Sequence, residues 1–273
     1  MIRIPKPKTL LLAALANFLA WTPPLTAAPL QLASHQAVYD LKLEELSTNS
    51  GIEAVRGRIV LRLEQQCEGI IMNQRMVLEM VNIEGGAIVS DYNLSTWEDN
   101  EGNIMRFDMS NRLNGQQIDK YSGVAQRQEG TASVTFSEPA QDDMELPATV
   151  VFPAEHTRSI IEAALSGENL LSAKVFDGNG AEGLSDTLAV IGKKKTFADP
   201  SDVLEELKDR SYWPLQLSFF DLREQMNEPD YEVGMKMFEN GVAMDLRLKY
   251  QEFSLNGKMS NFSFLEPEKC SSE

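Results

Sequence analysis

Apolar and polar residues alternate with a period of two along most of the chain beyond residue 30. The pattern is clearest at 242–250, where Val242, Met244, Leu246, Leu248 and Tyr250 are separated by Ala243, Asp245, Arg247 and Lys249. The same period is found at 37–43, 55–63, 72–80, 105–109 and 132–136. Such alternation predicts strands with one buried and one wet face. The chain is therefore expected to be mainly β.

Turn signals lie between these runs at intervals that fit hairpins. They are Ser50-Gly51, Gly85-Gly86, Asn114-Gly115, Glu129-Gly130, Asn240-Gly241 and Asn256-Gly257. Asn-Gly is a strong signal for a tight hairpin. The spacing predicts a long antiparallel meander that forms a barrel, a sandwich or a strongly coiled sheet.

Two segments follow a helical period instead. Ile160, Ile161, Ala164 and Leu165 recur at helical spacing after Phe152-Pro153, and Gly167 stands where a C-terminal cap belongs, so a helix is expected over 154–166. Asp199-Pro200 resembles a second helix start, leading into Val203, Leu204 and Leu207 and ending before Trp213. No Pro-, Gly- or Ser-rich linker divides the chain, which predicts a single domain over 29–273 with a few short helices.

The N-terminus has the composition of a secretory signal. Arg3, Lys6 and Lys8 precede an apolar run over 10–20, which is too short to span a bilayer, and small residues lead up to Ala28. We expect residues 1–28 to be a cleaved signal peptide that directs the protein to the periplasm; the alternative is a buried or interfacial N-terminal helix. No second long apolar stretch follows, so no integral membrane segment is expected in the mature chain.

Charge excludes one class of partner. The chain has 25 Lys and Arg against 41 Asp and Glu, a net charge of −16. A basic footprint for nucleic acid is missing, so binding of DNA or RNA is not expected. The excess of acid should also repel an anionic membrane surface.

Cys67 and Cys270 are the two cysteines of the chain. Two thiols cannot complete a four-cysteine zinc site, and they lie too far apart for a Cys-x-x-Cys redox pair. In an oxidising compartment a structural disulfide is expected. The alternative is two free buried cysteines that pack as small apolar side chains.

The search for catalytic or cofactor chemistry gives few candidates. Gly178, Gly180 and Gly183 match G-x-G-x-x-G, but a strand-like segment follows where a dinucleotide site needs a helix. His156 could serve as a general base, although no serine nucleophile motif accompanies it, and no histidine pairing suits a metal. We expect neither a cofactor nor a metal.

One extended segment carries two acids and an aromatic residue. Asp91 and Trp97 are six apart and should share a face of a strand, while Glu98 takes the other. The two carboxylates therefore cannot form an acid/base pair.

The chain has 12 methionines, most of them at apolar positions of the expected strands. Core filling explains them most simply. The alternative is a groove lined by flexible side chains that holds an apolar ligand such as an acyl chain.

Several short motifs, in order, resemble the EipB family of cell-envelope integrity proteins of α-proteobacteria. They are Ser34 to Leu41, Cys67-x-Gly69, Ser90-Asp91 leading to Thr96-Trp97-Glu98, Phe152-Pro153-x-x-His156-Thr157, Phe176-Asp177-Gly178 and the closing Cys270. The resemblance covers nearly the whole mature chain. It implies a periplasmic β-spiral, a sheet coiled into a cup, with a Cys67–Cys270 disulfide. It also implies a non-enzymatic role in envelope integrity and stress resistance, and no catalytic residue carries over; Asp91, Trp97, Glu98, His156 and Asp177 are motif positions without an assigned role.

Two functions are consistent with these observations. The first is a periplasmic scaffold or binding module for a protein partner, of the helical-repeat type among others. The alternative is a carrier of lipid or lipoprotein with an apolar cup.

Overall fold

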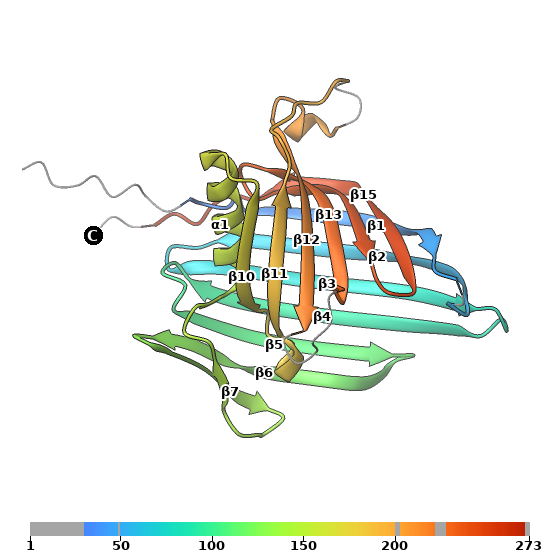
Figure 1. The fold of residues 1–273 in the computed structure, drawn as a ribbon, viewed down its shortest axis with the longest axis horizontal. Coiled ribbons are helices and arrows are strands. Elements are labelled where there is room, and N and C mark those ends of the chain that lie inside the picture. The colour runs from blue at the N-terminus through green and yellow to red at the C-terminus, as the bar shows by residue number, and fades with distance from the viewer. Residues whose placement is uncertain (1–29, 49, 200–202, 222–227, 271–273) are drawn as a thin grey trace, which may run out of the picture.

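The computed structural model describes residues 30–48, 50–199, 203–221 and 228–270. The predicted signal peptide, residues 1–28, lies outside the described residues. Within them, 15 strands form one sheet (Figure 1). The first eight are β1 (His35–Leu46), β2 (Ile52–Gln65), β3 (Gly69–Asn82), β4 (Ala87–Asp99), β5 (Ile104–Leu113), β6 (Gln116–Gln128), β7 (Thr131–Glu138) and β8 (Met144–Leu146). The remaining seven are β9 (Val150–Val151), β10 (Leu170–Phe176), β11 (Leu184–Ile191), β12 (Tyr212–Asp221), β13 (Tyr231–Phe238), β14 (Ala243–Lys249) and β15 (Phe253–Phe264).

Neighbouring strands in the sequence are neighbours in the sheet, as the meander predicts. The spatial order runs from β8 back to β1, then from β15 back to β9, so the first and last strands pair in the middle of the sheet. All pairs are antiparallel except β9 with β10. The two edge strands, β8 and β9, have three and two residues. The predicted mainly β meander is confirmed.

The sheet coils until its two ends overlap. In Figure 1, β10 to β14 cross in front of β1 to β6, which makes the molecule a nearly closed barrel. At the overlap, the ring of Phe107 on β5 meets that of Phe176 on β10 edge to face, with centroids 5.6 Å apart. Both belong to a cluster of buried residues drawn from β5 to β10. The predicted coiled cup is therefore confirmed.

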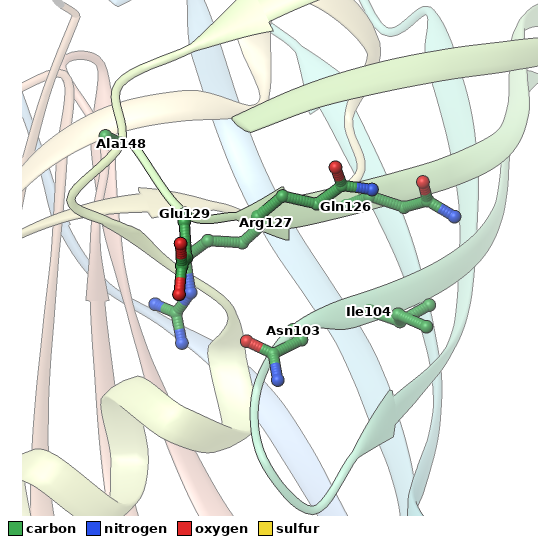
Figure 2. Close-up of a pocket in the computed structure, with 7 residues that line it drawn as sticks. Asn103, Ile104, Gln126, Arg127, Glu129 and Ala148 are labelled. Carbon is green, nitrogen blue, oxygen red and sulfur yellow. The ribbon is translucent and has the colours of Figure 1, made fainter. Parts of the chain in front are cut away.

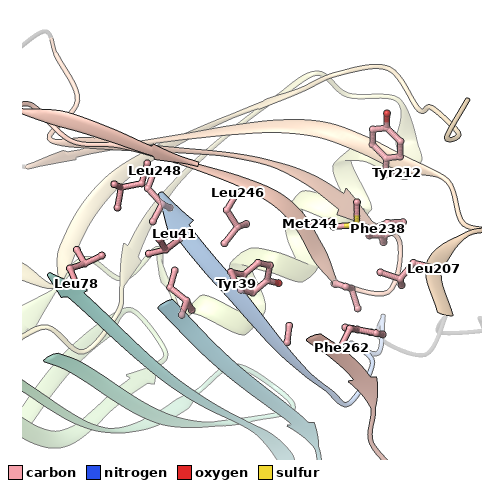
Figure 3. Packing of buried hydrophobic residues seen from close by; sticks show 14 of the residues in the cluster. Tyr39, Leu41, Leu78, Leu207, Tyr212, Phe238, Met244, Leu246, Leu248 and Phe262 are labelled. Atoms are coloured by element: carbon pink, nitrogen blue, oxygen red, sulfur yellow. The ribbon is translucent and has the colours of Figure 1, made fainter. Parts of the chain in front are cut away.

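Side chains on the inner face of β1 anchor the largest core cluster. His35, Ala37, Tyr39 and Leu41 are buried at every second position. Figure 3 shows Tyr39 and Leu41 facing Leu246 and Leu248 of β14 across the core. The Tyr39 hydroxyl donates a hydrogen bond to the carbonyl oxygen of Ala243 at 2.7 Å, so this buried phenol is satisfied.

The predicted helix over 154–166 is confirmed as α1 (Pro153–Ser166). Pro153 stands at its first turn, and Gly167 ends it in the left-handed conformation with φ of 85°. Ile160, Ile161 and Ala163 of α1 belong to one buried cluster with residues of β11 to β13, Leu63 of β2 and Ile70 of β3. The helix thus fills one end of the coiled sheet.

The second predicted helix is wrong within the described residues. Residues 200–202 lie outside them, and the segment after them forms only a 3₁₀ turn, η3 (Glu205–Leu207). Leu204 has extended backbone, with φ of −66° and ψ of 149°, which stops a helix from continuing through it. Leu207 is fully buried in the core cluster, so its apolar character reflects tertiary packing rather than helical periodicity.

The predicted turn at Asn256-Gly257 is also wrong, because both residues lie inside β15. A Cβ at Gly257 would lie 2.8 Å from Cδ2 of Leu41 and 3.1 Å from Cβ of Leu246. Glycine is therefore required by close packing within the sheet. The other predicted turns connect strands.

Candidate functional site

Glu98 caps the start of α1 from a distant strand. Phe152 occupies the capping position and has no side chain that can accept a hydrogen bond, and Pro153 has no N–H. The carboxylate of Glu98 accepts from the N–H of Ala154 at 2.9 and 3.0 Å and from that of Glu155 at 3.4 Å. A helix N-terminus favours negative charge, so Glu98 supplies the missing cap.

The environment of Glu98 is strongly desolvated. Its side chain is 1% exposed, and this burial raises its pKa to about 7. The N–H groups of Ala154 and Glu155 and the positive charge of Arg158 act in the opposite direction. The carboxyl group therefore changes its protonation near neutral pH while it holds the end of a helix.

His156 is held as a neutral side chain between α1 and β11. Its Nε2 lies 3.2 Å from the hydroxyl oxygen of Thr187, and that hydroxyl donates its proton to the carbonyl oxygen of Ala173 at 3.0 Å. Since the hydroxyl has a single proton, Nε2–H of His156 must be the donor to it. Burial lowers the pKa of His156 to about 4. The ring is therefore a structural hydrogen-bond donor at neutral pH.

Asp91 and Trp97 lie on the outer face of β4, as their spacing predicts, and Glu98 lies on the inner face. Asp91 accepts two hydrogen bonds from Arg75 of β3, at 2.9 and 2.8 Å, which hold its pKa below the usual value. The guanidinium of Arg106 on β5 lies 5.1 Å from the centre of the Trp97 ring. Both motif residues thus bind neighbouring strands together on the outside.

Asp177 begins the glycine-rich turn between β10 and β11. Its Oδ1 accepts the N–H of Asn179 at 2.9 Å, and burial raises its pKa to about 6. A Cβ at Gly178 would lie 2.9 Å from Cβ of Phe107, and one at Gly180 would lie 2.7 Å from the ring of Tyr121. The glycines let the turn lie against the inner face of β5 and β6. The turn leads through η1 (Gly180–Glu182) into β11, as expected for a connection that is not a dinucleotide loop.

Cys67 and Cys270 form a disulfide, with Cα atoms 5.5 Å apart and a sequence separation of 203. The bond ties the end of the chain to the turn between β2 and β3. Glu268 reinforces it, since its carboxylate accepts the N–H of Cys67 at 3.0 Å. The prediction of a structural bridge is confirmed.

A pocket of about 580 Å³ lies on the surface beside the start of α1 (Figure 2). Five of its seven lining residues are polar, among them Asn103, Gln126 and Glu129. Arg127, which also lines it, donates to the carbonyl oxygen of Val150 at 2.8 Å and to Glu155 at 3.2 Å. The guanidinium therefore serves the connection between β9 and α1.

The comparisons with known proteins agree with one another. A family model described as EipB-like matches residues 26–266, nearly the whole described chain. The chain belongs to the EipB-like family. It is 30% identical over 237 residues to the cell envelope integrity protein EipB of Brucella abortus, covering 85% of this chain and 84% of that protein. It also resembles a crystal structure of a β-barrel-like protein of a domain of unknown function from Brucella abortus, with a TM-score of 0.81 and 28% identity over 87% of this chain and all of that one.

The motif residues that the chain shares with the EipB family lie in two parts of the structure. Glu98 and His156 meet at α1, and the disulfide closes the chain near the same end of the sheet. Asp177 lies apart from them, near the crossing of β10 with β5. No three His, Cys, Asp or Glu side chains of the described residues gather in a way that could hold a metal ion. In the same part of the chain, no helix has the length and apolar character needed to cross a bilayer.

Sequence reasoning did not identify the partners of these residues. Thr187 is an ordinary strand residue. Arg158 is a buried charge on α1, a helix that the sequence indicates only by its apolar face.

Proposed function

We propose that this protein is a non-enzymatic binding module that acts in the periplasm and maintains the integrity of the cell envelope. Support comes from its family, from a relative named for cell envelope integrity, and from the signal-like sequence of residues 1–28. Glu98 and His156 also serve α1, with hydrogen bonds to backbone N–H groups and to Thr187. These hydrogen bonds hold the fold, which supports a role other than acid/base chemistry.

The observation that carries the proposal is a row of exposed apolar side chains on and beside the turns at the end of the sheet opposite α1. This turn-end patch consists of Leu46, Ile83, Val89 and Ile118, which are 41, 72, 38 and 52% exposed. The hydrogen bond from Ile83 N–H to the carbonyl of Gly51 keeps the β1–β2 and β3–β4 turns together. Val89 is tied to the β5–β6 turn in the same way, through Asn114 N–H at 2.7 Å. Exposed apolar side chains along one end of a sheet are a candidate surface for protein association.

The charges beside the turn-end patch indicate the kind of partner. Glu53, Glu84 and Glu252 are exposed and lie next to Ile52, Ile83 and the β14–β15 turn. Their carboxylates favour a protein surface with apolar pockets rimmed by Lys or Arg. A helical-repeat protein can present such a surface, in keeping with the expectation from sequence.

Strand addition is a less suitable mode of binding for this sheet. The two edge strands have only three and two residues, which leaves little backbone to pair with a partner strand. Contact through side chains of the turn-end patch is therefore the better route.

A second candidate, a carrier of lipid or lipoprotein, is favoured by the inner face. Met72, Met76 and Met80 of β3 point inward and are half-buried, as is Met235 of β13. These flexible side chains are not fully enclosed by protein, and an acyl chain could cover them.

Complementation tests the first candidate. A host strain that lacks the gene receives either the wild type or a triple variant, Leu46→Gln, Ile83→Gln and Ile118→Gln. The matched control, Leu165→Gln, Leu170→Gln and Val190→Gln, changes three exposed apolar residues around α1 and β10. We expect the patch variant to fail to restore growth on a bile-salt detergent, with normal protein level and melting temperature, while the control restores it. Full growth with the patch variant would refute the patch as the functional surface.

A further inference from the structure

The pocket beside the start of α1 is formed by three segments of the chain. Its lining consists of residues 103–104 where β5 begins, residues 126–129 where β6 ends, and Ala148 between β8 and β9 (Figure 2). Its volume of about 580 Å³ lies within the range of about 300–1,000 Å³ that is usual for sites of small molecules. We call it the β6 pocket.

Hydrogen bonds within the protein hold the three segments together. The backbone N–H of Arg127 donates to the carbonyl oxygen of Asn103 at 2.8 Å. The guanidinium of Arg127 donates to the carbonyl oxygen of Val150 at 2.8 Å, and the N–H of Val150 donates to the carbonyl oxygen of Pro147 at 2.9 Å. The segment that carries Ala148 is thereby fixed against β6. The β6 pocket is thus largely pre-formed, as sites for small molecules usually are.

The charges of the β6 pocket do not favour an anionic ligand. Arg127 brings the positive charge of the lining, but its Nη2 lies 3.1 Å from Oε2 of Glu155, so this charge is already offset. Glu129 adds a carboxylate to the lining. A phosphate or carboxylate ligand would therefore meet a guanidinium that is paired and a second negative charge beside it.

The polar groups of the β6 pocket suit hydroxyl groups instead. Three of the lining residues are carboxamides: Asn103, Gln126 and Gln128. A carboxamide has an acceptor oxygen and two N–H donors, and a hydroxyl group both donates and accepts. Two neighbouring hydroxyls of one ligand can therefore bind the oxygen and the nitrogen of a single carboxamide.

Apolar groups lie beside these polar ones. In Figure 2 the side chains of Asn103, Arg127 and Glu129 point toward one another. Ile104 and Ala148 line the same pocket, and the stem of Arg127 adds further CH₂ groups. A sugar ring has the same combination, because its hydroxyls lie around the ring and its C–H groups cover the two faces.

We propose that the β6 pocket binds a neutral saccharide. The carboxamides of Asn103, Gln126 and Gln128 bind its hydroxyls, and its C–H groups lie against Ile104 and Ala148. The pocket lies beside α1 and the turn-end patch lies at the opposite end of the sheet, so the inference goes beyond the proposed function and each can fail alone. A small sugar and the sugar units of a glycan chain share this chemistry, and the length of the oligosaccharide bound distinguishes them.

NMR titration of the isotope-labelled mature protein tests the site with four probes: cellobiose, diacetylchitobiose, tetraacetylchitotetraose and the anionic digalacturonate. We expect the neutral disaccharides to shift the amide signals of residues 103–104 and 126–129 in a saturable way, and digalacturonate to leave them unchanged. The double variant Asn103→Ala and Gln126→Ala should weaken the binding at least ten-fold, because it removes two side chains that bind hydroxyls. Ala148→Trp keeps the carboxamides but fills the pocket, so it should abolish binding. Asn103, Gln126 and Ala148 are exposed, and all three substitutions should leave the melting temperature unchanged.

Gln116→Ala with Gln117→Ala is the matched control, because it removes two exposed carboxamides at the other end of β6, and it should leave binding unchanged. Tighter binding of the tetrasaccharide than of diacetylchitobiose would identify a glycan chain as the ligand, and equal affinity would identify a small sugar. No saturable shift with either neutral disaccharide, equal or tighter binding of digalacturonate, or full binding by Ala148→Trp would overturn the proposal.

Discussion

Replacing Glu98 by Gln should change the pH dependence of stability in a direction opposite to that of most carboxyl groups. The pKa of Glu98 rises from 4.5 to about 7 in the folded protein, with burial as the main cause. The folded state therefore binds this proton more strongly than the unfolded state does. The stability contributed by protonated Glu98 is fully present below pH 4.5 and is lost as the pH rises through 7.

The magnitude follows from the difference between the folded and unfolded pKa of this carboxyl. A rise in pKa from 4.5 to about 7 corresponds to about 3.4 kcal/mol of stability over a pH range that extends beyond both values. Between pH 5 and pH 8, about 2.5 kcal/mol of this is expressed. The glutamine of the variant keeps a carbonyl oxygen that can accept the N–H of Ala154 and has no proton to exchange. The free energy of unfolding of the wild type minus that of Glu98→Gln should thus fall by about 2.5 kcal/mol from pH 5 to pH 8.

Urea unfolding followed by tryptophan fluorescence measures this difference at four pH values. Subtraction of the variant removes the contributions of His156 and Asp177, which both proteins share. Glu79→Gln serves as control, because Glu79 pairs with Arg56 on the exposed outer face, away from the start of α1. A wild-type minus Glu98→Gln difference that is constant from pH 5 to pH 8 would refute the placement of a buried carboxyl at the start of α1.

Three further predictions concern other parts of the fold. The ring nitrogen signals of His156 should keep the Nε2–H pattern from pH 8 down to about pH 5 in NMR spectra, and titration near 6.5 would contradict its burial. The double variant Cys67→Ser and Cys270→Ser should lose about 5 kcal/mol of unfolding free energy in calorimetry, because the bond closes a loop of 203 positions; an unchanged melting temperature would count against this. Gly180→Ala should destabilise by about 1–3 kcal/mol in urea unfolding, and by more than Gly130→Ala, since both have positive φ but only position 180 faces a ring; equal losses would contradict the contact.

Local patterns predicted most of the strands and α1. The alternation at 242–250 matches β14, where Met244, Leu246 and Leu248 are buried. Pro153 and Gly167 mark the first turn and the cap of α1. These features succeed because strand and helix periods, and the conformations of Pro and Gly, are set by a few neighbouring residues.

Non-local packing decided the features that the patterns missed. Gly257 is a glycine because Leu41, more than 200 positions earlier in the chain, occupies the space of its side chain. Leu207 is buried by the core rather than by a helix of its own. The predicted disulfide indicated that segments near the two ends of the mature chain lie close together. The pairing of β1 with β15, however, follows from no local signal.

The candidate site was predictable only in part. The spacing of Asp91, Trp97 and Glu98 correctly assigned them to the two faces of one strand. That Glu98 caps α1 could not be inferred, since the helix start lies 56 positions away in sequence.

Photo-crosslinking in living host cells tests the central claim, that the protein acts by binding a partner through the turn-end patch. Benzoylphenylalanine at position 83, the most exposed residue of the patch, is compared with the same group at position 190, which is also exposed but lies on β11. The account predicts one discrete protein adduct from position 83 that disappears with Leu46→Gln and Ile118→Gln, and none from position 190. Adducts of equal yield from both positions, or none from position 83, would contradict it.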